Sequence, residues 1–216
     1  MSGLQHHFVA GLRAQREVEY LNASSRLQKL HLAQAEDELC GPLALAQAVM
    51  LVCGWSRATV GNLATRQEPM RTFWRRAMEY QSDGTSESDL SALAALLAPA
   101  IEFQVSKTAS ATRIASLVAD AIDQGHVPLI RYTTNRFSHW CMIAGHERAA
   151  DGSRSALLAL DTDMPCPWAV LFNCRVELRP HSRKAYPYAI RGTDGELWYA
   201  KLDSVCIVRR GEGNLR

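Results

Sequence analysis

The stretch QAEDELCGPLALAQAVM, residues Gln34 to Met50, joins a polar segment to a long apolar run through the tripeptide Cys-Gly-Pro. From Pro42 to Cys53 the apolar positions follow helical spacing so densely that we expect a mostly buried helix. Gly54 then supplies a stop signal for that helix. Cys40 is therefore expected at the helix start, where the rest of the fold determines its role.

A thiol at a helix N-terminus meets unpaired N–H groups and the positive end of the helix dipole, which favour the nucleophilic thiolate. Pro42 suits the first helical turn, and Gly41 permits a close approach of the backbone to another group. Cysteine is also among the most buried residue types and is usually inert. On its own the motif favours a buried packing cysteine, so the partners of Cys40 decide between the two interpretations.

The pattern along the chain predicts an α+β protein, with helices first and a mostly antiparallel sheet second. We expect an N-terminal helical extension over residues 1–33 and a main domain over 34–216. Further helices are expected over 56–65, 69–80, 90–97 with Ser86 or Ser88 as the cap, and 112–124. Short apolar runs predict strands over 101–105, 127–132, 139–147, 155–161, 186–191, 196–202 and 205–210.

Composition excludes several classes of protein. The chain has 216 residues, of which 47% are hydrophobic, enough for one sizeable core. A formal net charge of +2 with mixed signs gives no electrostatic footprint for nucleic acid or an anionic membrane. No apolar stretch reaches the roughly 20 residues that span a bilayer, and the first residues lack a secretory signal pattern. We expect a cytoplasmic protein; its oligomeric state is left open.

The six cysteines contain no CxxC pair, which favours reduced thiols over a disulfide scaffold. Cys166, Cys174 and His146 match no usual zinc-binding spacing. The sequence therefore predicts neither a metal nor another cofactor.

A nucleophilic cysteine needs a base and a group that orients the base. His139 opens an apolar strand directly after a loop, whereas His146 ends that strand and faces the opposite side if the strand is regular. Asp161 ends the next strand, which the short connection AADGS makes a hairpin neighbour, so it can approach His139. Asp163 is a competing choice. The remaining histidines are expected to be solvated: His6, His7, His31, His126 and His181.

Gln34 lies six residues before Cys40 and can supply a side-chain N–H beside the backbone N–H of Cys40. The order Gln34, Cys40-Gly-Pro, His139-Trp and a strand-ending Asp161 resembles the papain-like cysteine peptidases of the C39 type, which trim leader peptides in bacteriocin exporters. The resemblance covers about residues 30–165. It implies a papain-like fold and a peptide or protein substrate. It also implies roles for Gln34 in the oxyanion hole, Cys40 as nucleophile, His139 as general base and acid, and Asp161 in orienting the imidazole.

Two departures limit the transfer. The segment DTDMP replaces the Asp-Pro that is frequent in the family, which keeps Asp163 open, and no exporter segment follows in this sequence. The same order of residues is also similar to phytochelatin synthase, so acyl transfer is an alternative to hydrolysis. A peptide-binding module without catalysis is a third possibility. The loop from Met164 to Arg183 is a candidate wall of the substrate cleft, and Trp140 is expected to be structural.

Overall fold

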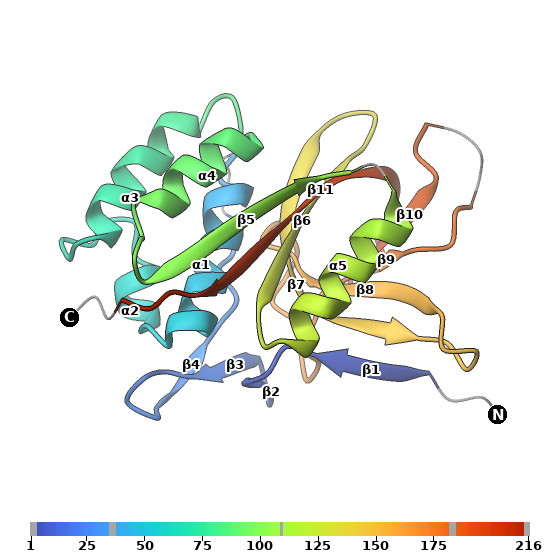
Figure 1. Ribbon diagram of the computed structural model, residues 1–216, viewed down its shortest axis with the longest axis horizontal. Coiled ribbons are helices and arrows are strands. Elements are labelled where there is room, and N and C mark those ends of the chain that lie inside the picture. Colours follow the sequence, from blue (N-terminus) through green and yellow to red (C-terminus); the bar gives the residue numbers. More distant parts are fainter. Residues whose placement is uncertain (1–3, 35–37, 109, 182–184, 214–216) are drawn as a thin grey trace.

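The computed structural model describes residues 4–34, 38–108, 110–181 and 185–213 (Figure 1). It contains five α-helices and one short 3-10 helix: α1 (Cys40–Cys53), α2 (Arg57–Val60), α3 (Met70–Ala77), η1 (Met78–Tyr80), α4 (Glu87–Ala95) and α5 (Ala111–Asp123). The strands are β1 (Gln5–Phe8), β2 (Leu12–Ala14), β3 (Val18–Leu21), β4 (Leu27–Lys29), β5 (Ile101–Lys107), β6 (Val127–Thr133), β7 (Ser138–Arg148), β8 (Arg154–Leu160), β9 (Cys174–Glu177), β10 (Tyr188–Gly192) and β11 (Leu197–Arg210). The predicted α+β class, with helices mostly in the N-terminal half, is confirmed.

Six antiparallel strands close on themselves in the order β7, β6, β11, β10, β9 and β8, with β8 pairing back to β7. Closure leaves few free sheet edges, since each of these strands has a partner on both sides. Two more strands extend the arrangement, because β1 pairs with β7 and β5 pairs with β11. The strands β2, β3 and β4 form a separate small sheet.

Helix α1 is a core element. All of its residues except Leu51 and Val52 are buried, as the dense apolar pattern predicts, and Gly54 ends it with a φ of 64°. The helix contacts β6, β7 and β11. Helices α1 to α4 gather on one side of the molecule, and α5 lies across the strands on the other (Figure 1). The start of α1 is thereby held against the strands that carry the predicted base.

The predicted N-terminal helical extension is wrong. Residues 5–29 form β1 to β4, and β1 is part of the main sheet through its pairing with β7. The segment follows a period of two, since Val18 and Tyr20 are buried while Leu21 is exposed. A turn follows, in which the Asn22 side chain accepts hydrogen bonds from the backbone of Ser24 and Arg26. The local polar residues indicated a helix, but turn chemistry and cross-strand pairing determine the structure.

Other elements differ in extent from the sequence prediction. Ser86 caps α4 with a capping box, as one of the two predicted caps, and Gly125 follows α5 with a φ of 76°. The two strands expected over 196–202 and 205–210 are one strand, β11, with an irregularity between Leu202 and Ser204. Strand β9 lies in the segment that the sequence indicated only as a loop. Among the described residues, no helix is long and apolar enough to cross a membrane.

Candidate active site

Cys40 is the first residue of α1 and is only 4% exposed. The next residue must be small, because a Cβ atom on Gly41 would lie 2.9 Å from Thr85 Cβ. Thr85 is held there by Trp140, whose indole N–H donates to the Thr85 carbonyl over 2.8 Å. Trp140 therefore has a structural role, since its hydrogen bond joins the start of β7 to the loop that packs against Gly41.

His139 and Asp161 form a buried pair. The distance from His139 Nε2 to Asp161 Oδ1 is 2.8 Å, and both side chains are almost fully excluded from solvent. Tyr132 lies opposite His139 in the β6–β7 hairpin and donates its hydroxyl to Asp161 Oδ2 over 3.2 Å. Asp161 follows β8, whose pairing with β7 brings that strand end near His139. Of the two carboxylates that the sequence left open, Asp161 is the one in contact with His139.

Burial opposes charge on each member of the pair, but their mutual attraction is stronger. Desolvation would lower the pKa of His139, yet the Asp161 carboxylate and its hydrogen bond hold that pKa well above its ordinary value. Desolvation would raise the pKa of Asp161, yet the imidazolium and the hydrogen bonds from its neighbours hold it below its ordinary value. Each member of the pair therefore stabilises the charged form of the other.

The Cys40 side chain makes a hydrogen bond with His139 and also contributes to the raised pKa of that imidazole. Because Nε2 is engaged by Asp161, Nδ1 is the ring nitrogen that remains for the sulfur. The structure thus brings a thiol, an imidazole and a carboxylate into one chain of contacts. Such a chain can move a proton from sulfur to nitrogen and hold the resulting charge.

The backbone of Asp161 is clamped by a residue that the sequence did not indicate. Asn173 is fully buried; its Oδ1 accepts from the Asp161 N–H over 2.7 Å and its Nδ2 donates to the Asp161 carbonyl over 2.8 Å. His31 Nε2 lies 2.9 Å from the same carbonyl oxygen. These contacts fix the position of the carboxylate relative to His139.

Gln34 lies beside the residue that follows Asp161. Its backbone N–H donates to the Thr162 carbonyl over 2.6 Å, and its Oε1 accepts from the Thr162 hydroxyl over 3.3 Å. The same segment is tied to α1, since Gln47 Oε1 accepts from the Leu32 N–H over 3.1 Å. Residues 35–37, which connect Gln34 to the start of α1, lie outside the described residues.

Asp163, the competing carboxylate, is exposed, and its backbone N–H donates to Asp161 Oδ1 over 2.9 Å. The contact with His139 is made by Asp161. His146 is fully buried against His7, and burial with the nearby charge of His7 lowers its pKa to about 4. His139 and His146 therefore meet different surroundings, as expected.

The expectation that His31 is solvated is wrong: it is 5% exposed, and burial lowers its pKa despite the neighbouring Asp161. Its position between Leu30 and Leu32 was the available sequence signal. Tyr132 could have been found from its place opposite His139 in the predicted hairpin. No sequence signal pointed to Asn173, because its partners are backbone groups distant in the sequence.

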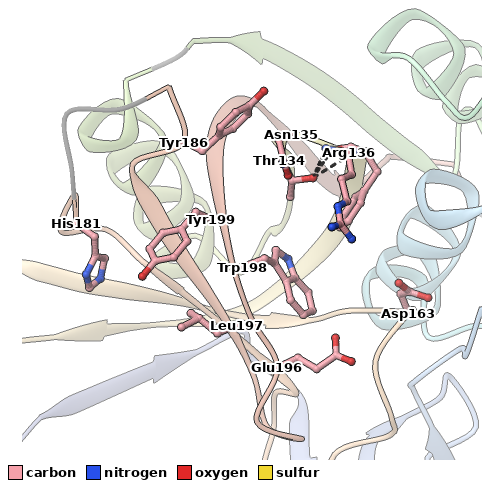
Figure 2. Close-up of a pocket in the computed structure, with 11 residues that line it drawn as sticks. Thr134, Asn135, Arg136, Asp163, His181, Tyr186, Glu196, Leu197, Trp198 and Tyr199 are labelled. Atoms are coloured by element: carbon pink, nitrogen blue, oxygen red, sulfur yellow. Dashed lines mark hydrogen bonds between the residues drawn. The ribbon is translucent and has the colours of Figure 1, made fainter.

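An open cavity of about 980 Å³ lies next to this site (Figure 2). Phe137, whose ring centroid is 6.3 Å from that of His139, contributes to its wall. Cys40 and His139 do not line the cavity, which borders them through the loop before β7 and through Asp163. Its lining is aromatic with charges of both signs and comprises Thr134, Asn135, Arg136, Phe137, Asp163, His181, Tyr186, Glu196, Leu197, Trp198 and Tyr199.

Comparison with protein-family models gave no match, and comparison with curated proteins gave no significant similarity.

Proposed function

We propose that this protein is a cysteine peptidase or amidase of papain-like fold, similar to the C39 type. One observation carries the proposal: His139 contacts both Cys40 and Asp161 in a buried site at the start of α1. A packing cysteine has no need of an imidazole that is hydrogen-bonded to a carboxylate held in place by Asn173. That arrangement is what an activated thiol requires.

In the proposed reaction the Cys40 thiol gives its proton to His139 Nδ1, and the sulfur attacks the carbonyl carbon of the substrate. The oxyanion that forms is stabilised by the backbone N–H of Cys40 and by the Gln34 side chain. His139 then protonates the leaving amine, which breaks the C–N bond and leaves a thioester on Cys40. Water, deprotonated by His139, attacks the thioester and releases the acid.

Asp161 acts on His139 rather than on the substrate. Its carboxylate accepts a hydrogen bond from His139 Nε2–H, which keeps Nδ1 directed at the thiol and stabilises the imidazolium that forms during the reaction. The neighbouring cavity supports a peptide substrate, since its aromatic walls and mixed charges suit side chains and backbone together.

The test is to incubate the protein with a diverse peptide mixture and to identify new termini by mass spectrometry. Cleavage should disappear in Cys40→Ala. It should persist in Cys53→Ala, a matched control because Cys53 is buried at the other end of the same helix. Equal cleavage by Cys40→Ala and the parent would contradict the proposal.

Hydroxylamine added to the same incubation distinguishes the fate of the thioester. Accumulation of hydroxamate at the expense of acid indicates that an amine can intercept the acyl group, which favours acyl transfer. Acid as the product throughout favours hydrolysis.

A further inference from the structure

A second cluster of reactive side chains lies away from the candidate active site. His7 of β1 is the direct cross-strand partner of His146 of β7, and the two imidazoles stack with their centroids 4.9 Å apart and their planes 6° from parallel. The strands approach closely here, since a Cβ atom on Gly145 would lie 2.5 Å from the His7 carbonyl oxygen. The pairing of β1 with β7 therefore places the two rings together.

His146 is an unusual buried group. Its exposure is 0%, and neither of its ring nitrogens has a hydrogen-bond partner among the described residues. Buried polar side chains in native structures almost always have a partner, because an unpaired one loses its bonds to water without compensation. A missing ligand would account for these nitrogens.

Asp123 supplies a carboxylate at the same place. It is the last residue of α5, and single ligand atoms of His7, His146 and Asp123 all lie within 4.8 Å of one another. Its ion pair with Arg148 is long, at 4.0 Å, and its side chain is 55% exposed. The carboxylate is therefore free to turn toward the two imidazoles.

We propose that His7, His146 and Asp123 form a binding site for a divalent transition-metal ion of the Zn²⁺ type. Two imidazoles and one carboxylate are a common ligand set for zinc, and imidazole selects such ions over Mg²⁺ and Ca²⁺. Water completes the coordination.

Binding requires a modest contraction of the cluster. Zinc bonds to nitrogen and oxygen of about 2.0–2.2 Å place tetrahedral ligand atoms roughly 3.3 Å apart. His7, which is half-buried on an edge strand, and Asp123, which is exposed, can make this adjustment while His146 stays fixed. The rings rotate out of their parallel stack so that both lone pairs meet at one point.

The two arginines next to the cluster are each paired with an aspartate, so their charges are balanced. Arg148 and Arg154 oppose a cation, but each is within 4.0 Å of a carboxylate of α5, Asp123 and Asp120 respectively. The ligand bonds, rather than a surrounding negative field, would therefore provide the affinity.

The ion would join three elements: β1, β7 and α5. His146 lies seven residues along β7 from His139, a span of about 23 Å in an extended strand. The site is thus structural and independent of the proposed peptidase activity. It would fasten the N-terminal strand to the closed sheet.

The test is titration of the full chain with Zn²⁺ and with Co²⁺, in a Cys40→Ser, Cys166→Ser background that removes the candidate nucleophile and the exposed thiol. Calorimetry should show one bound equivalent, and Zn²⁺ should raise Tm. The Co²⁺ absorption spectrum should contain no thiolate charge-transfer band. Such a band, or no binding at all, would overturn the proposal.

His7→Ala and Asp123→Asn should each weaken binding roughly tenfold or more. The matched controls are His6→Ala, the neighbouring histidine that faces Glu147, and Asp83→Asn, an exposed aspartate in the loop before α4. Both controls should bind within about twofold of the parent. Unchanged affinity in His7→Ala or Asp123→Asn, or an equal loss in His6→Ala, would overturn the assignment.

Discussion

Replacement of Asp161 by alanine tests whether the buried pair holds the site together. The carboxylate is fully buried and accepts three hydrogen bonds: from His139, from the Tyr132 hydroxyl and from the Asp163 N–H. Removing one partner of a buried ion pair typically costs about 3–5 kcal/mol, because the other charge stays uncompensated. For a chain of this size that corresponds to a fall in Tm of roughly 6–20 °C.

The pH dependence of this loss follows from the two shifted groups. The pKa of Asp161 is lowered in the folded protein, so its stabilisation is present above its ordinary pKa and is lost as pH falls through the lowered value. The pKa of His139 is raised, so its stabilisation is present below its ordinary pKa and is lost as pH rises through the raised value. The stability difference between parent and variant should therefore be largest between these limits and shrink on both sides.

Thermal unfolding followed by circular dichroism over a series of pH values measures this difference. Asp163→Ala is the matched control, because that side chain is exposed, and it should change stability by no more than about 0.5 kcal/mol. A difference below about 1 kcal/mol at neutral pH for Asp161→Ala, or one that does not vary with pH, would refute the reasoning.

Three further substitutions probe the surroundings of the site. Asn173→Ala removes both hydrogen bonds to the Asp161 backbone and should lower the free energy of unfolding by about 1–3 kcal/mol, measured by chemical denaturation. The peptidase rate should fall as well; an unaltered rate would show that these bonds are unnecessary for activity. Gly41→Ala forces a contact with Thr85 and should lower the free energy of unfolding by about 1–3 kcal/mol. A second substitution, Thr85→Gly, should largely restore this stability; no recovery would show that the strain lies elsewhere. Gln34→Ala should lower kcat by about 10²–10³-fold in the peptide assay, whereas the control Gln28→Ala should leave kcat unchanged. Equal rates in the two variants would show that Gln34 is not part of the oxyanion hole.

The sequence predicted the parts of the fold whose local pattern and tertiary role agree. Helix α1 has a continuous apolar pattern and a glycine stop, and the α4 cap has its serine, so both could be located. The approach of the strand end at Asp161 to His139 could be predicted from hairpin geometry, because a short connection makes adjacent strands antiparallel neighbours, but that geometry left Asp163 as an alternative.

The remainder depends on distant contacts that leave little local trace. The N-terminal segment is polar because most of its strands are short and partly exposed, and only pairing with β7 explains why β1 is extended. Asn173 is hydrogen-bonded chiefly to backbone groups, and every residue type has these groups, so the sequence does not reveal its partners. The His7 and His146 pair depends on a strand register between residues far apart in the chain, so neither histidine could be recognised as a partner of the other.

The most direct test of the proposed activity is the order in which the thiols react. With limiting iodoacetamide at neutral pH in a Cys166→Ser background, mass spectrometry should find Cys40 modified before the other buried cysteines, Cys53, Cys141, Cys174 and Cys206. His139→Ala should slow the modification of Cys40 by about 10²-fold, while His126→Ala should leave it unchanged. Modification of another thiol first, or an unchanged Cys40 rate in His139→Ala, would contradict the claim that His139 activates Cys40.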